Sequence, residues 1–198
     1  MKLAAALLAC IALAACGPDF RPAARILADK PPESREPVVD RRRTYFGGDT
    51  ARPRREWHVL ILPGGAEELH GKDSGWFADG HLEYEHEFDH DQPTGLWRSW
   101  YANGKPHSEA TFGKSEPAPM RWWFENGQLS SEGTALNGVK DGAWTTWHPN
   151  GAKASQGSYV AGRREGAWSF WKEDGTHEGS GDYRNDAKVG VWDYSSRR

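Results

Sequence analysis

A unit of about two dozen residues recurs along this chain and constrains its fold more than any other feature. Its consensus is Gly-x-Trp-x-x-Trp, then Asn-Gly or Asp-Gly, then an aromatic residue eight positions after that glycine. Such a short period indicates one supersecondary unit repeated along a line. The second tryptophans of successive units lie 23 or 24 residues apart, at Trp76, Trp100, Trp123, Trp147 and Trp171. The first tryptophans stand at Trp97, Trp144, Trp168 and, in a truncated sixth unit, Trp192.

The turn residues of the unit predict what it folds into. An Asn-Gly or Asp-Gly pair between aromatic-rich segments is a strong hairpin signal, because both central residues of a type I′ turn need positive φ. Segments such as 96–101 are rich in aromatics and lack helical spacing, and connections such as 160–166 are short and contain glycine. We therefore predict an all-β fold, in which residues 71–194 form a repetitive antiparallel meander of hairpins in one elongated, twisted sheet.

The tryptophans allow two interpretations. Trp97 and Trp100 are three residues apart, so they point to opposite faces of a regular strand. Aromatics at equivalent positions of neighbouring units can form ladders, each pair adding about 0.5–1.5 kcal/mol beyond area burial. Alternatively, one row stays partly exposed and contacts a partner. The candidate partner-binding residues of this kind are Trp100, Trp123, Trp147 and Trp171.

An acidic segment in the first unit is a second candidate surface. Strand alternation places five carboxylates on one face and His86 and His90 on the other. The row is either a solvated face or a patch that steers a basic partner. Calcium needs ligands from a curved loop, and zinc has no obvious third ligand beside the two histidines, so we predict no metal site and no cofactor. The candidate partner-binding acids are Glu83, Glu85, Glu87, Asp89 and Asp91.

No catalytic motif is recognisable in the chain. It lacks a G-x-S-x-G elbow, a phosphate-cradling glycine loop and a zincin helix, and its glycines fall at the fixed period of the turns. A single-layer sheet also offers few dry pockets in which a carboxyl pKa could be tuned. We therefore expect that this is not an enzyme.

The N-terminus predicts export and lipidation. Residues 1–15 have the short apolar core of a signal peptide, and residues 13–17, Leu-Ala-Ala-Cys-Gly, resemble the bacterial lipobox. The resemblance implies cleavage before Cys16 and acylation of its thiol, and several acyl chains would anchor the protein stably. An ordinary secretory signal would instead leave Cys16 as a free thiol. Gly17 after the cysteine, as in similar Gram-negative lipoproteins, implies an outer-membrane anchor facing the periplasm.

The remaining segments complete the predicted domain organisation. Residues 16–56 contain many prolines and an excess of arginine, so we expect a flexible linker that rests on anionic headgroups or stays solvated. Residues 57–70 read as a capping strand and loop, and residues 195–198 as a tail. Residues 57–198 carry 14 basic and 21 acidic side chains, which argues against nucleic acid as a partner.

The unit resembles the MORN repeat, in the variant found in bacterial proteins labelled antitoxins of the YwqK type. The resemblance covers residues 71–194 and rests on G-x-W-x-x-W-Y-x-N-G at residues 95–104 and on trailing aromatics such as Tyr159. It implies a hairpin-repeat binding module that neutralises a toxin by direct contact. The third unit departs from the pattern, with Met120 and Ala135 in place of aromatics, and there we predict a local notch.

These observations predict a lipid-anchored envelope protein whose repeats bind a protein partner, with a toxin as the partner that the resemblance implies. The alternative is a structural envelope component that contacts peptidoglycan, other lipoproteins or membrane phospholipid. The first predicts a single soluble partner, whereas the second predicts co-sedimentation with cell wall or flotation with liposomes.

Overall fold

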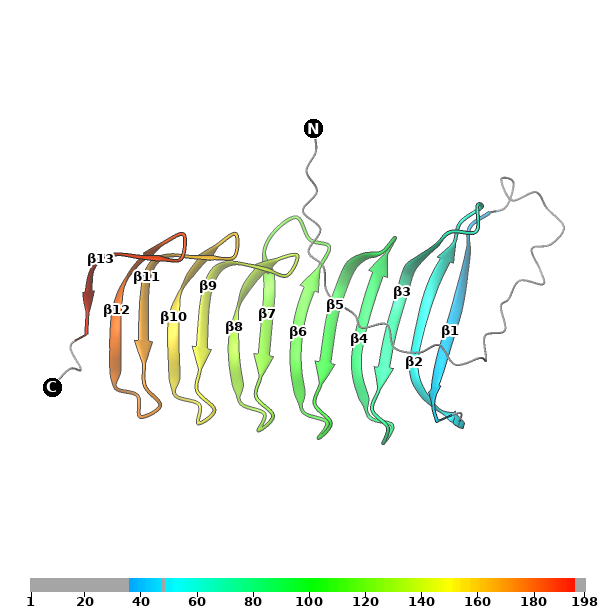
Figure 1. Cartoon of the computed structure of the whole chain (residues 1–198), viewed down its shortest axis with the longest axis horizontal. Coiled ribbons are helices and arrows are strands. Elements are labelled where there is room, and N and C mark those ends of the chain that lie inside the picture. Colours follow the sequence, from blue (N-terminus) through cyan, green and yellow to red (C-terminus); the bar gives the residue numbers. More distant parts are fainter. Residues whose placement is uncertain (1–35, 48, 195–198) are drawn as a thin grey trace.

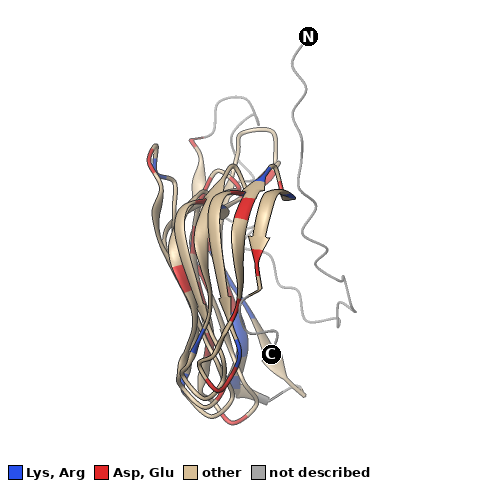
Figure 2. Ribbon diagram, turned by 90° about the vertical axis from the view of Figure 1, so that its left-hand side faces the viewer, with Lys and Arg blue, Asp and Glu red and all other residues tan. Residues whose placement is uncertain are grey.

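The protein is one antiparallel sheet in a single layer. The computed structural model describes residues 36–47 and 49–194, in which thirteen strands follow one another in chain order (Figure 1). From the side, the strands are curved and stacked into one bent layer (Figure 2). The predicted all-β hairpin meander is therefore confirmed. None of the described residues lies in a helix that is long and apolar enough to cross a bilayer.

The strands are β1 (Val38–Phe46), β2 (Asp49–Ile61), β3 (Glu67–Trp76), β4 (Leu82–Asp89), β5 (Gln92–Trp100), β6 (Pro106–Phe112), β7 (Ala118–Trp123), β8 (Leu129–Leu136), β9 (Val139–Trp147), β10 (Lys153–Val160), β11 (Arg163–Trp171), β12 (His177–Arg184) and β13 (Ala187–Asp193). The repeats begin at β3, and each consists of one strand with the paired tryptophan positions and one strand with the trailing aromatic.

The Asn-Gly turns do not adopt the predicted type I′ geometry. At the β5–β6 turn only Gly104 has positive φ, at 78°, and its N–H donates to the carbonyl of Tyr101 at 2.9 Å. Asn103 instead uses its side chain: Oδ1 accepts from the N–H of Lys105, and Nδ2 donates to the carbonyl of Glu125 in the next turn, both at 3.0 Å. The asparagine thereby links neighbouring units and does not need positive φ.

Turns with two consecutive residues at positive φ lie at the opposite ends of the strands, where one unit connects to the next. A two-residue type I′ hairpin requires positive φ at both of its central residues. The four turns are His90-Asp91, Asn137-Gly138, Ala161-Gly162 and Asn185-Asp186.

The first-tryptophan positions, which we call the inner row, form the core of the sheet. Trp144 and Trp168 are 1% and 3% exposed, and their Nε1 atoms donate to the carbonyls of Thr134 and Ser158. Tyr159 stands between them in edge-to-face contact, with ring centroids 6.1 and 5.1 Å away. The predicted aromatic ladder is thus confirmed for this row. The inner row consists of Asp73, Trp97, Met120, Trp144, Trp168 and Trp192.

The side chains of the third unit are packed without a notch, so the prediction of a local notch is wrong. Met120 and Ala135 are 9% and 3% exposed and form a buried cluster with Ala110 and Trp144. The rings of Phe112, Trp122 and Tyr159 pack against this cluster and fill the space that the smaller side chains leave.

The sheet extends further towards the N-terminus than predicted. Residues 38–46 and 49–56 lie in β1 and β2, so the prediction of a flexible linker is wrong for them. Their arginines are engaged in the sheet: Arg42 donates to both carboxylate oxygens of Glu67, and Arg43 donates to Glu56. Of the predicted capping strand and loop at 57–70, residues 57–61 are the end of β2, where Val59 is buried, and residues 67–70 are the beginning of β3. Residues 1–35, including Cys16, and the 195–198 tail lie outside the described residues.

Candidate binding surface

The second-tryptophan positions, which we call the outer row, lie on the face opposite the inner row, because three residues separate the two positions within a strand. The guanidinium of Arg98 lies 5.7 Å from the ring of Trp100, and the ammonium of Lys153 lies 5.3 Å from that of Trp171. All members of the row are half-buried, so part of each ring remains accessible. The outer row is Trp76, Trp100, Trp123, Trp147 and Trp171.

The acidic segment is less uniform than its sequence suggests. Glu83, Glu85 and Glu87 share one face of β4, but Glu85 pairs with Arg98 at 3.0 Å. Asp89 ends the strand beside two histidines. Asp91 is not part of the row, because it lies in the turn and its Oδ1 accepts from the N–H of Leu69 at 2.7 Å. The prediction of five aligned carboxylates is therefore wrong for Asp91.

The two histidines of the acidic segment are also separated. His86 stacks between Tyr84 and Trp97, with ring centroids 4.7 and 4.0 Å away, on the inner-row face. His90 has a positive φ of 48° and lies in the turn. Burial lowers the pKa of His86.

The first unit replaces the inner-row tryptophan with a buried ion pair. Asp73 is 5% exposed and accepts hydrogen bonds from Nε and Nη2 of Arg55 at 2.9 and 2.7 Å. The hydroxyl of Tyr84 also approaches its Oδ1, at 3.4 Å. Burial, together with the Asp73 carboxylate, raises the pKa of Tyr84 to about 12. This cluster connects β2 with the first repeat, and the sequence did not single it out.

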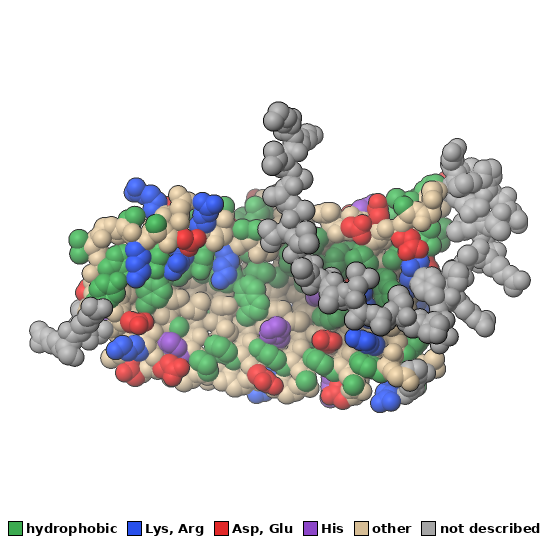
Figure 3. All heavy atoms as spheres, in the orientation of Figure 1, with side chains coloured by type: hydrophobic (Ala, Val, Ile, Leu, Met, Phe, Trp, Pro, Cys, Tyr) green, Lys and Arg blue, Asp and Glu red, His purple; other side chains and the backbone are tan. Residues whose placement is uncertain are grey.

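A row of cations that the sequence analysis missed lies over the inner aromatics. Lys140 Nζ is 4.3 Å from the ring centroid of Trp144, and Lys188 Nζ is 4.0 Å from that of Trp192. The guanidinium of Arg164 lies 4.0 Å from the ring of Tyr183. Figure 3 shows Lys and Arg side chains gathered beside hydrophobic ones over the C-terminal strands. We call these three residues the cation row.

A sequence signal for the cation row exists. Lys140, Arg164 and Lys188 are 24 residues apart, and each stands four positions before an inner-row tryptophan. The corresponding residues of earlier units are Pro93 and Glu116, so the row belongs to the C-terminal half of the sheet. Cations over aromatic faces are attracted by the ring quadrupole. Burial against these rings lowers the pKa of Lys140.

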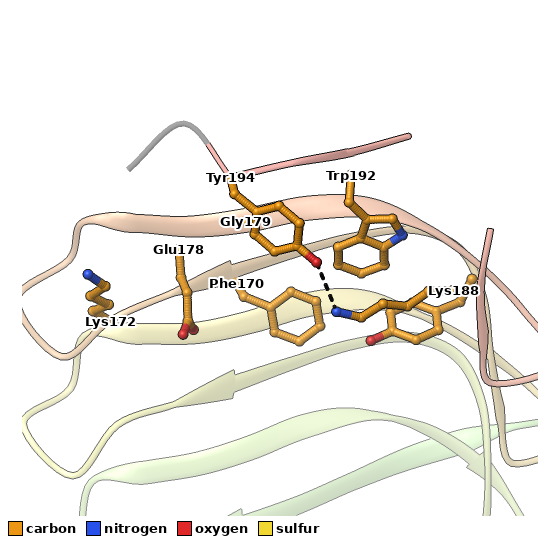
Figure 4. Close-up of a pocket in the computed structure, with 8 residues that line it drawn as sticks. Phe170, Lys172, Glu178, Gly179, Lys188, Trp192 and Tyr194 are labelled. Carbon is orange, nitrogen blue, oxygen red and sulfur yellow. Dashed lines mark hydrogen bonds between the residues drawn. The ribbon is translucent and has the colours of Figure 1, made fainter. Parts of the chain in front are cut away.

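The row ends in a hollow of about 430 Å³ between β11, β12 and β13 (Figure 4). Lys188 Nζ donates to the hydroxyl of Tyr194 at 3.2 Å, and Trp192 lies beside it. Lys172 and Lys188 lie at opposite sides of the hollow, and the aromatic faces with the Lys188 ammonium suit an apolar or planar group that carries an acid. The lining residues are Phe170, Lys172, Glu178, Gly179, Tyr183, Lys188, Trp192 and Tyr194.

Comparison with known proteins identifies the repeats. Residues 93–113, 118–137 and 140–161 each match the MORN repeat variant. The three segments coincide with the hairpins β5–β6, β7–β8 and β9–β10. No curated protein matches the chain. The chain is thus a repeat protein whose central hairpins match the MORN repeat variant.

Proposed function

We propose that this protein is a lipid-anchored binding module of the bacterial envelope that holds a protein partner on its inner-row face. The observation that carries the proposal is the cation row over the largely buried aromatics of the inner-row face, with Lys140 and Lys188 at its ends. Their contacts are to aromatic rings and, for Lys188, also to a tyrosine hydroxyl. Arg164 in the middle is paired with Asp186 at 3.0 Å. The end cations are therefore the ones available to an incoming carboxylate.

The spacing of the row indicates the shape of the partner. Equivalent positions of successive units are two strands apart, which is about 10 Å at the usual strand spacing. An extended peptide covers about 10 Å in three residues. We therefore propose an extended segment with acidic side chains at every third residue or multiples of it, and with apolar side chains between them against the half-buried rings of this face, such as Phe170 and Trp192. A toxin carrying such a segment would make the protein an antitoxin or immunity protein.

The partner is tested by comparing variants in one capture experiment. The full chain and its Lys140→Gln/Lys188→Gln double variant are cross-linked in envelope extract, and captured proteins are quantified by mass spectrometry. We expect one protein that the wild type enriches and the double variant loses. A Glu83→Gln/Glu87→Gln variant, which changes the opposite face, is the matched control and should retain it. Equal capture by all three proteins would contradict the proposed surface.

The anchor is tested separately. We propose that Cys16 carries the acyl groups, on the basis of the lipobox-like sequence of residues 13–17. Cys16→Ala should move the protein from the membrane fraction to the soluble fraction, and intact-mass measurement should show the loss of the lipid. An unmodified Cys16 in the wild type would contradict this part of the proposal.

A further inference from the structure

We propose that His70, Asp89 and His90 bind one divalent transition metal ion, with Zn²⁺ as the best fit, near the beginning of β3 and the end of β4. Each residue offers one ligand atom, and these atoms all lie within 4.8 Å of one another. The site lies apart from the cation row, which belongs to the C-terminal strands. Its test is therefore independent of the proposed function.

The distances between the three side chains suit a shared ion. His70 on β3 and Asp89 on β4 occupy the position that follows the Gly71–Phe88 pair, so the two side chains face each other across the strands. His70 Nδ1 lies 3.2 Å from Asp89 Oδ1, and His90 Nδ1 lies 2.7 Å from the same oxygen. Ligands of a tetrahedral zinc ion, at about 2.0–2.1 Å from the metal, are about 3.3 Å from one another. Little movement is needed to admit the ion.

One ring nitrogen points to a missing ligand. His70 Nδ1 is buried and makes no hydrogen bond, although the carboxylate oxygen is only 3.2 Å away. The two atoms are near each other without hydrogen-bond alignment. A buried polar atom without a partner is rare in proteins and costs stability. A metal ion bound by all three residues would give His70 Nδ1 a partner and would replace the hydrogen bond between His90 Nδ1 and Asp89 Oδ1.

The turn that carries His90 is held in an unfavourable conformation. His90 and Asp91 have φ of 48° and 61°, close to the 48° and 66° of Asn185 and Asp186 in the last such turn, whereas the turns at 137–138 and 161–162 place glycine at the second position. Two hydrogen bonds fasten the turn to β3: Asp91 N–H donates to the carbonyl of Leu69 at 2.9 Å, and Leu69 N–H donates to Asp91 Oδ1 at 2.7 Å. These bonds hold His90 beside His70.

The donor set selects the type of ion. Two imidazole nitrogens with one carboxylate oxygen suit Zn²⁺ and its neighbours Co²⁺, Ni²⁺ and Cu²⁺, whereas Ca²⁺ and Mg²⁺ prefer oxygen ligands only. Asp89 and His90 are more than half exposed, so water can occupy the fourth position.

The test uses the full chain without a polyhistidine tag and Co²⁺ as a visible probe. We expect one equivalent of Co²⁺ to give a ligand-field absorption band that Zn²⁺ then abolishes. His70→Gln and His90→Asn should each weaken binding by at least about tenfold, since even changes outside the first ligand shell cost 10- to 100-fold. Asparagine tolerates positive φ, so His90→Asn retains the turn.

His81→Asn is the matched control. His81 Nδ1 lies 3.2 Å from Asp79 Oδ2, an exposed His–Asp pair like that of the proposed site, but this pair belongs to no three-residue ligand group among the described residues. This variant should bind Co²⁺ as the wild type does. The proposal is overturned if the wild type binds no stoichiometric Co²⁺, if His70→Gln and His90→Asn bind it equally well, or if His81→Asn loses it to the same extent. Circular dichroism without metal confirms that each variant is folded.

Discussion

At the residue scale, the sheet depends on glycines that lie directly against tryptophan rings. A Cβ on Gly157 would lie 2.2 Å from Cδ2 of Trp168, in a position without positive φ. Gly157→Ala should therefore destabilise the protein by about 1–3 kcal/mol through overpacking, measured by urea denaturation. Gly64, whose Cβ would meet nothing within 4 Å, is the control, and Gly64→Ala should change stability by less than about 0.5 kcal/mol. Equal effects of the two variants would contradict this packing.

The equivalent of Gly157 in the first unit is His86, which makes stability depend on pH. Burial lowers its pKa below the ordinary 6.5, so the unfolded chain binds a proton that the folded chain resists. Stability should therefore fall as the pH drops below about 6.5. His86→Ala, which copies Ala110 of the next unit, should show a smaller loss of Tm between about pH 7.5 and pH 5. His107→Ala, in β6, should retain the wild-type loss. An unchanged loss in His86→Ala would exclude this origin.

At the element scale, the Arg55–Asp73 pair joins β2 to the first repeat. Arg55→Met would leave the Asp73 carboxylate, 7% exposed, with only the Tyr84 hydroxyl at 3.4 Å. Breaking a fully buried pair costs about 3–5 kcal/mol, and because Arg55 is 36% exposed we expect about 1–2 kcal/mol. The readouts are urea denaturation and faster amide exchange in β1 and β2. Arg98→Met, which breaks the exposed pair with Glu85, should cost less than about 1 kcal/mol; a cost as large as that of Arg55→Met would argue against burial as the cause.

The elements also show how far the sequence predicts this molecule. The meander follows from the period of the tryptophans and glycines, because each unit repeats the same local signals. β1 was missed because its arginines are typical of a solvated linker, and Glu67, the partner of Arg42, is distant in sequence. His70 was missed as a candidate ligand for a similar reason: the strand pairing, and not the sequence, brings it beside Asp89. The cation row was predictable from its 24-residue spacing, but only a structure shows that it lies over rings.

At the scale of the whole molecule, the order of the strands makes stability local. Every strand pairs only with its neighbours in the chain, so a change in one unit reaches the others only through the intervening strands. Gly157 lies in β10, and its Trp168 partner lies in β11. Hydrogen exchange of Gly157→Ala under native conditions should therefore be faster in β9–β12 and unchanged in β2–β5, with Gly64→Ala as the reference for an unstrained substitution. A uniform increase from β2 to β13 would instead show that the sheet opens as a single cooperative unit, and the description of the protein as a linear array of coupled hairpins would then be wrong.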